Sequence, residues 1–208
     1  KRRRIAPRTR RPSTSRPATK TNSPDREMAL QRRIKAVVIG ASWGGIEASI
    51  QVLKALPQNF PVPVFLVQHL RASPDNRLPT VFGSRVTVPV LSPEDKEVIE
   101  AGHVYVAPPG YHMLVDDNGT LALSLHWPVY YSRPSVDELF FSAGHVYGDG
   151  TLAVLLTGAN EDGAAAMTYV AQRGAYTIAQ DPDTAEEPVV PASAIATACV
   201  QKVLPLPA

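Results

Sequence analysis

Residues 36–45 read AVVIGASWGG, and this stretch decides the fold. The apolar run at 36–39 has no polar face, which is typical of a strand buried on both sides in a helix-covered parallel sheet. The small residues that follow form a tight turn into a helix, because apolar residues recur at helical spacing over 46–56 before Pro57 stops the helix.

A second apolar run, at 62–67, follows this helix and ends in Gln68 and His69. Two buried strands joined by a helix make a βαβ unit, so the strands are expected to be parallel neighbours. The carboxyl ends of parallel strands lie at one edge of the sheet, and this predicts that His69 lies next to Ser42.

The remainder of the chain continues the alternation of strands and helices. Strands are expected at 86–90, 103–107, 152–156, 175–179 and near the C-terminus, and helices at 135–147, 164–173 and 193–200. The first of these helices opens with Ser135 and Glu138 at the spacing of a capping box. Asp117-Asn118-Gly119 predicts an antiparallel hairpin. The expected fold class is α/β, a doubly wound, mostly parallel sheet with helices on both faces and an antiparallel hairpin.

Three polar residues follow buried strands at the predicted carboxyl edge of the sheet. Ser42 lies at the tip of the small-residue turn, where free helix N–H groups favour negative charge. His69 supplies an imidazole that can take up a hydroxyl proton. Asp162, in the loop after strand 152–156, can accept the other ring N–H and fix the tautomer. Together they predict a nucleophile, a base and an orienting acid.

Each of these residues also has a purely structural interpretation. Ser42 and Asp162 are common helix-capping residue types, and a lone loop histidine is more often structural than catalytic. Asn160 and Glu161 compete with Asp162 for the position beside His69. The presence of all three residue types of one mechanism at one sheet edge favours the triad.

Nucleotide, α/β-hydrolase and metal patterns fit the chain poorly. The turn lacks the middle glycine of G-x-G-x-x-G, no acidic residue follows the second strand, and no Lys-Ser/Thr pair marks a P-loop. Residues 40–44 match G-x-S-x-G, but the α/β-hydrolase order places the histidine last, and no histidine follows His145. No H-E-x-x-H or comparable ligand spacing occurs, so neither a metal nor a cofactor is expected.

These residues resemble the catalytic domain of the chemotaxis receptor protein-glutamate methylesterases, the CheB family. The resemblance covers residues 34–208 and rests on short motifs along that range. They are Val38-Ile39-Gly40-Ala41-Ser42 with Gly44-Gly45, Gln68-His69, Ala107-Pro108-Pro109-Gly110 with His112-Met113, Arg133-Pro134-Ser135-Val136-Asp137, Leu156-Thr157-Gly158 with Asp162-Gly163, and Ala179-Gln180-Asp181. Together the motifs are highly specific.

The resemblance implies a serine hydrolase that demethylates glutamate methyl esters on chemotaxis receptors and also deamidates glutamines. Ser42 would attack the ester, His69 would carry the proton, and Asp162 would orient His69. The family's oxyanion hole uses backbone N–H groups, which correspond here to Trp43 and Ala159. The implied partners are methylated receptor helices in the cytoplasm.

Three departures from the family's usual pattern bear on substrate choice. Trp43 stands where threonine is common, and Ala159 where methionine is common, but the hole survives because its donors are main-chain groups. Residues 187–192 lack the usual Met-Pro-Arg, which leaves Arg133 as the nearby candidate for substrate binding. These departures keep a second hypothesis open, a catalytically weak signalling or interaction module that retains the methylesterase fold.

Residues 1–33 differ sharply in composition from residues 34–208. They hold 12 of the 21 Lys and Arg side chains but only two of the 19 acidic ones, with four prolines. This predicts a disordered basic tail or linker ahead of the catalytic domain, and nucleic-acid binding by the tail is the weaker alternative. The tail cannot form the family's usual phosphoreceiver domain. The chain is therefore unregulated in that way, controlled by a separate phosphoreceiver or kinase partner, or part of a longer protein.

Cysteine usage and hydropathy bear on the compartment. Cys199 is the only cysteine, which excludes an internal disulfide and fits a reducing cytoplasm. No apolar run approaches the roughly 20 residues of a membrane helix, so a soluble cytoplasmic protein without a membrane span is expected.

Overall fold

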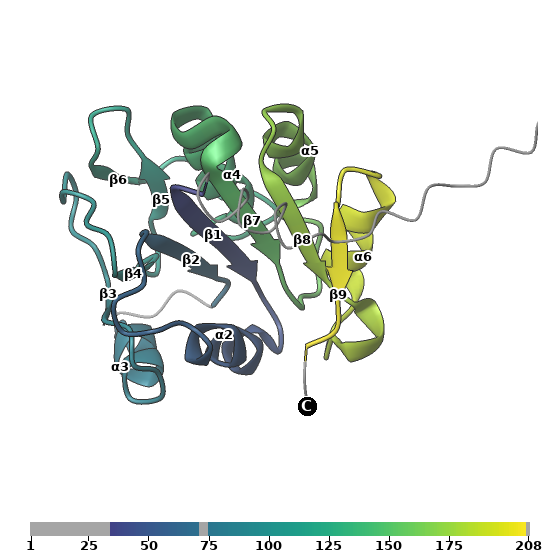
Figure 1. Cartoon of the computed structure of the whole chain (residues 1–208), viewed down its shortest axis with the longest axis horizontal. Helices are drawn as coiled ribbons and strands as arrows, with labels where there is room; N and C mark the ends of the chain where they lie inside the picture. The colour runs from purple at the N-terminus through teal and green to yellow at the C-terminus, as the bar shows by residue number, and fades with distance from the viewer. Residues whose placement is uncertain (1–33, 71–74, 207–208) are drawn as a thin grey trace, which may run out of the picture. The chain divides into compact units, whose positions relative to one another are not determined.

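The computed structural model describes residues 34–70 and 75–206, which form a parallel sheet with helices on both faces (Figure 1). Seven strands pair in the order β3-β4-β2-β1-β7-β8-β9, and every pairing between them is parallel. The strands are β1 Ala36–Ala41, β2 Val64–Gln68, β3 Val90–Leu91, β4 Val104–Val106, β7 Thr151–Leu155, β8 Tyr176–Gln180 and β9 Lys202–Leu204. The expected fold class is confirmed.

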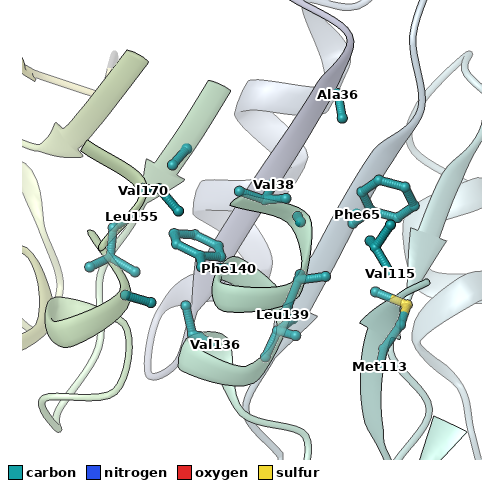
Figure 2. Close-up of a cluster of buried hydrophobic side chains, with 14 of the residues drawn as sticks. Ala36, Val38, Phe65, Met113, Val115, Val136, Leu139, Phe140, Leu155 and Val170 are labelled. Atoms are coloured by element: carbon teal, nitrogen blue, oxygen red, sulfur yellow. The ribbon is translucent and has the colours of Figure 1, made fainter. Parts of the chain in front are cut away.

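The apolar run of β1 contributes buried side chains to both faces of the sheet, because successive side chains of a strand point to opposite sides. Ala36 and Val38 pack into one cluster of buried side chains, whereas Val37 and Ile39 pack into another. Figure 2 shows the first cluster, where side chains of α4 meet those of the sheet. Helices α4 (Val136–Tyr147), α5 (Ala164–Gln172) and α6 (Val189–Ala196) cover this face, and α2 (Gly45–Lys54) and α3 (Leu78–Gly83) cover the other.

The predicted hairpin forms a sheet of its own. Strands β5 (His112–Val115) and β6 (Leu121–Ser124) pair antiparallel, and Gly119, with φ +81°, supplies a left-handed residue in the turn between them. Buried side chains of the hairpin join the cluster covered by α4, and the Val115 N–H donates to the Ser142 hydroxyl at 3.1 Å. Within residues 34–70 and 75–206, this hairpin is the one antiparallel pair of strands, and isolated antiparallel bridges also join Val98 to Thr120 and Val129 to Ser132.

Two elements, α6 and β3, begin four residues from their expected positions, and helix α3 was not predicted. Helix α3 lies in a stretch for which the sequence predicts no helix. Only two of its side chains are buried, so it shows no apolar periodicity, and Pro79 is tolerated because it lies in the first turn. Helix α6 begins at Val189 instead of Ser193, again with a proline in the first turn. Strand β3 occupies Val90–Leu91 instead of 86–90.

The predicted basic tail, residues 1–33, lies outside the described residues. Within the described ranges, no helix combines the length and the apolar character needed to cross a membrane. Two short 3-10 helices, Gly148–Gly150 and Pro182–Thr184, complete the described elements.

The order of the strands reverses at β1. Strands β2, β4 and β3 lie on one side of β1, and β7, β8 and β9 lie on the other. In doubly wound sheets, ligands bind in the crevice at the carboxyl ends of the strands where the order reverses. Ser42, directly after β1, lies at this position.

Candidate active site

Ser42 lies in a tight turn that joins β1 to α2. The Gly45 N–H donates to the Ser42 carbonyl at 2.9 Å, and Gly44 has φ +74° and ψ −8°, the left-handed conformation that a type II turn requires at its third residue. The Ser42 N–H donates to the Thr157 carbonyl at 2.9 Å, which links the turn to the end of β7. A Cβ on Gly158 would lie 2.6 Å from the Ser42 Cβ, so only glycine allows this close approach.

His69 extends the pairing of β2 with β1 by one residue, because its N–H donates to the Ala41 carbonyl at 2.9 Å. The side chains of His69 and Ser42 line the same groove. Gln68 joins the two strand ends, since its side-chain amide donates to the Ser42 carbonyl at 2.6 Å and to the His69 carbonyl at 3.0 Å. The relative position of serine and histidine is therefore set by the sheet itself.

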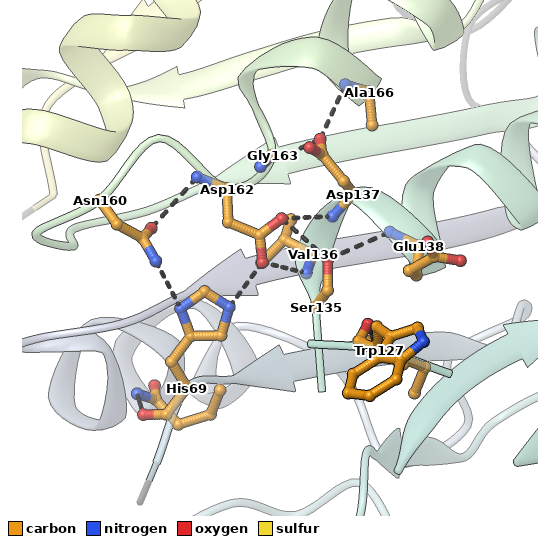
Figure 3. Close-up of polar contacts among 12 residues, drawn as sticks. His69, Trp127, Ser135, Val136, Asp137, Glu138, Asn160, Asp162, Gly163 and Ala166 are labelled. Atoms are coloured by element: carbon orange, nitrogen blue, oxygen red, sulfur yellow. Dashed lines mark hydrogen bonds and ion pairs between the residues drawn. The ribbon is translucent and has the colours of Figure 1, made fainter. Parts of the chain in front are cut away.

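The Asp162 carboxylate is fully buried and accepts four hydrogen bonds (Figure 3). His69 Nε2 lies 2.7 Å from one oxygen, which also accepts the Val136 N–H at 2.7 Å. The other oxygen accepts the Ser135 hydroxyl and the Asp137 N–H, both at 2.9 Å. Three of the four donors belong to the start of α4, where the helix dipole favours a negative charge. The carboxylate is therefore held in one orientation.

The contact with Asp162 assigns the hydrogen of the neutral His69 ring. A carboxylate can only accept, so Nε2 carries the hydrogen and Nδ1 carries the lone pair. The Asn160 side-chain amide lies 3.5 Å from Nδ1, which is a long and weak contact. Nδ1 is thus the nitrogen available to Ser42, although no hydrogen bond joins the two side chains in the described part of the chain.

Asp137 is a second buried carboxylate beside this network. One of its oxygens accepts the Gly163 and Ala166 N–H groups, at 3.1 and 2.9 Å, at the start of α5. Burial raises the pKa of Asp137 to about 6; the hydrogen bond from Ala166 opposes this shift, and the negative charge of Asp162 adds to it. Acidic residues are ordinary in the first turn of a helix, so nothing in the sequence marks Asp137 for this role.

A groove of about 870 Å³ opens beside Ser42 and His69. Its lining includes Trp43 and Ala159, and neither backbone N–H has a hydrogen-bond partner within residues 34–70 and 75–206. The Trp43 side chain is 66% exposed, and its indole N–H donates to the Glu186 carboxylate at 2.9 Å, which links the Ser42 turn to the loop before α6. Among the described residues there is no group of three His, Cys, Asp or Glu side chains suited to a metal ion.

Arg133 also lines the groove, but part of its guanidinium is already engaged. Nη1 donates to the Leu125 and His126 carbonyls, both at 2.9 Å. Nε is buried and has no hydrogen-bond partner in the described part of the chain. Arg133 therefore anchors the loop that precedes it and presents only part of its guanidinium to the groove.

The alternatives to Asp162 within its own loop do not occupy its position. Asn160 contacts the opposite ring nitrogen, and Glu161 is exposed. Ser135, expected only as a helix cap, accepts the Glu138 N–H and also donates to Asp162. Local patterns do not signal this second bond, because its two partners are 27 residues apart in the chain.

Comparisons by sequence and by structure identify relatives of this chain. A family model described as CheB methylesterase matches residues 37–208. A putative protein-glutamate methylesterase/protein-glutamine glutaminase of Leptospira interrogans is 41% identical over 172 residues, which are 83% of this chain and 89% of that protein. The protein-glutamate methylesterase/protein-glutamine glutaminase 1 of Carboxydothermus hydrogenoformans is 41% identical over 177 residues, which are 83% of this chain and 52% of that protein.

A solved structure agrees with these matches. The crystal structure of the Thermotoga maritima CheB methylesterase catalytic domain has a TM-score of 0.79 and 33% identity to this chain, and the match covers 83% of this chain and 93% of that one. The chain thus spans most of the Leptospira protein but about half the length of the Carboxydothermus protein. The family model begins within β1 and includes Ser42, His69 and Asp162. By sequence and by fold, the chain belongs to the CheB methylesterase family of carboxylic ester hydrolases.

Proposed function

We propose that this chain is a serine hydrolase that removes methyl groups from glutamate side chains of chemotaxis receptors in the cytoplasm. Ser42 is the nucleophile, His69 the base, and Asp162 the residue that orients His69. The observation that carries the proposal is the 2.7 Å contact between His69 Nε2 and a fully buried Asp162, at the strand end next to Ser42. The names of the relatives supply the substrate class, methyl esters of glutamate side chains in proteins, and the resemblance to the CheB family supplies the receptors.

In the first step, the Ser42 oxygen attacks the ester carbonyl carbon while its proton passes to His69 Nδ1. Asp162 stabilises the imidazolium that results. The negative charge develops on the carbonyl oxygen, where the Trp43 and Ala159 N–H groups donate hydrogen bonds; losing one such donor typically costs about a hundredfold in rate or more. His69 then protonates the methoxy oxygen, and methanol leaves an acyl-serine.

In the second step, water attacks the acyl-serine with His69 again as base, which frees the glutamate carboxylate and restores Ser42. Deamidation of glutamine follows the same path with ammonia as the leaving group, in line with the second activity in the relatives' names. We assign Arg133 a contact with the substrate backbone or side chain through the part of its guanidinium that is not bound to the loop.

Regulation of this site is part of the same proposal. The Carboxydothermus relative is about twice as long as the matched region, so it has room for a further domain. We propose that a phosphoreceiver, separate from residues 34–208, controls access to the groove in response to a kinase. The predicted disordered basic tail then acts as a linker, and nucleic acid is not a partner.

The test is release of methanol from a receptor fragment that carries glutamate methyl esters. Ser42→Ala removes the nucleophile and should lower the rate by about 10³-fold or more. Ser84→Ala, which removes an exposed hydroxyl from the end of α3, is the matched control and should behave as the wild type. Equal methanol release by Ser42→Ala and the wild type would overturn the assignment.

A second candidate function is a binding module that keeps the fold but has lost most of its catalytic power. The observation in its favour is the exposed Trp43 side chain, which is bonded to Glu186 beside the nucleophile. A fluorophosphonate separates the two hypotheses because it requires an activated serine. Labelling of Ser42 at neutral pH supports the enzyme, and failure to label any residue supports the module.

A further inference from the structure

The segment 125–132, here called the aromatic loop, carries exposed aromatic side chains, and part of the loop lines the groove. Trp127 is 89% exposed, and Tyr131 is fully exposed. Tyr131 lines the groove together with Ser42 and His69, so the loop is part of the rim of the candidate active site. Neither ring is buried against the described part of the chain, so core packing does not explain either one.

The backbone of the aromatic loop is nevertheless held firmly. Arg133 Nη1 donates to the Leu125 and His126 carbonyls, both at 2.9 Å. The fully buried His112 donates from Nε2 to the next carbonyl, that of Trp127, at 3.2 Å. Two side chains from the body of the domain thus donate hydrogen bonds to three successive carbonyls. Because the loop is already ordered, less conformational entropy is lost when a ligand binds.

The tip of the loop adopts a backbone conformation that tyrosine disfavours. Val129 and Ser132 exchange two backbone hydrogen bonds, at 3.1 and 2.8 Å, so Tyr130 and Tyr131 form a two-residue hairpin turn. Their φ values are +46° and +62°, in the left-handed region where Asn-Gly is the usual pair. Backbone conformations of this kind cluster at binding and catalytic sites. They cost free energy and persist only where the surrounding structure holds them in place.

We propose that Tyr131, at the rim of the groove, and the exposed Trp127 of the same loop bind the polypeptide that carries the ester, so that the aromatic loop selects protein-borne esters over small free esters. The proposal rests on the proposed function and adds the residues that recognise the substrate. The occupant is a protein segment with apolar side chains flanking the modified glutamate, because Trp and Tyr dominate the binding energy of protein interfaces. The Glu186 carboxylate, which accepts the neutral indole N–H of Trp43, lines the same groove and disfavours an anionic lipid surface as the alternative occupant.

The experiment measures kcat and KM for two substrates, a receptor fragment carrying glutamate methyl esters and p-nitrophenyl acetate. We expect Trp127→Ala and Tyr131→Ala each to lower the ratio of kcat/KM for the fragment to kcat/KM for the small ester by about tenfold, mainly through a higher KM for the fragment. Val98→Ala removes an exposed apolar side chain outside the groove and should leave the ratio unchanged.

A double variant, Tyr130→Asn with Tyr131→Gly, separates recognition from folding. Asn-Gly fits the left-handed turn better than Tyr-Tyr, so the melting temperature should stay the same or rise while the ratio falls about tenfold. An unchanged ratio in the double variant would overturn the proposal. The proposal would also be overturned if the wild type bound phosphatidylglycerol vesicles and the double variant did not, because the loop would then recognise a lipid surface. Failure of the wild type to hydrolyse either ester would count against the proposed function instead.

Discussion

Asp137 and Asp162 cap each other's helices: Asp162 caps the start of α4, which contains Asp137, and Asp137 caps the start of α5, which follows Asp162. The Asp162 carboxylate accepts the Val136 and Asp137 N–H groups at the start of α4, and the Asp137 carboxylate accepts the Gly163 N–H directly after Asp162. This reciprocal capping joins α4 to α5 immediately behind His69. Two buried negative charges are held close together as a result, and the free energy of that arrangement depends on pH.

Replacing Asp137 by Asn should remove part of the pH dependence of stability. The pKa of Asp137 is about 6 in the folded protein against 3.8 for an isolated aspartate, so the folded state holds the proton more tightly. The tighter proton binding contributes about 3 kcal/mol to the free energy of unfolding. This contribution is complete below pH 4 and is lost as the pH rises through 6. Asn keeps the oxygen acceptor but has no proton to lose.

Urea unfolding of both proteins at pH 4 and at pH 8 measures this difference. From pH 4 to pH 8, the free energy of unfolding of Asp137→Asn should rise relative to that of the wild type by up to about 3 kcal/mol. Parallel stability curves for the two proteins would show that Asp137 does not titrate in this range.

Asp162→Asn should damage both catalysis and folding. An amide NH2 group would face donors on α4, leaving N–H groups unpaired at a cost of about 1–3 kcal/mol, and His69 would lose the acceptor that fixes its tautomer. We expect kcat for p-nitrophenyl acetate to fall by about 10³-fold or more. The exposed neighbour Glu161 provides the control, since Glu161→Gln should keep wild-type kcat and melting temperature. Equal losses in both variants would remove Asp162 from its assigned role.

Much of the fold could be predicted from continuous apolar runs. The runs at 36–39, 62–67 and 152–156 each have no polar face, which identified the three central strands β1, β2 and β7. A βαβ connection fixes the parallel direction, and it therefore predicted that Ser42 and His69 follow neighbouring strands. In the structure they do.

The parts that were not predicted depend on contacts between distant residues. The donors to Asp162 come from the start of α4, and neither periodicity nor spacing links the two segments. The Tyr130-Tyr131 turn contains no Gly, Asn or Pro, so it carries no turn signal, and its conformation is set by the bonds that hold the aromatic loop. Helix α3 is too short to show a periodic pattern.

Gly158→Ala should displace Ser42, the proposed nucleophile. The added Cβ would lie 2.6 Å from the Ser42 Cβ and 2.6 Å from the Val190 side chain, so the loop after β7 or the Ser42 turn must shift. We expect a loss of about 1–3 kcal/mol in stability and at least a tenfold loss of kcat. Gly83→Ala is the matched control, because a Cβ there meets nothing within 4 Å. Wild-type kcat in Gly158→Ala would mean that the position of Ser42 tolerates more movement than the structure implies.

Trp43→Thr should widen the groove while keeping the backbone N–H that we assign to the oxyanion hole. The indole lines the groove beside Ser42, so its removal should raise kcat/KM for p-nitrophenyl butyrate relative to the acetate by several fold, on the order of 1 kcal/mol. Glu186→Gln keeps an acceptor for the indole N–H and should leave this preference unchanged. The same acyl-chain preference in Trp43→Thr and the wild type would show that the indole does not limit the groove.

The central claim is that Ser42, His69 and Asp162 act as one catalytic unit, and the rate of methanol release from the methylated receptor fragment tests it most directly in single and combined variants. Residues of one unit are strongly non-additive, so the triple variant Ser42→Ala, His69→Ala, Asp162→Ala should be no slower than Ser42→Ala alone. Multiplicative losses across the three positions, or a Ser42→Ala protein as fast as the wild type, would contradict the account.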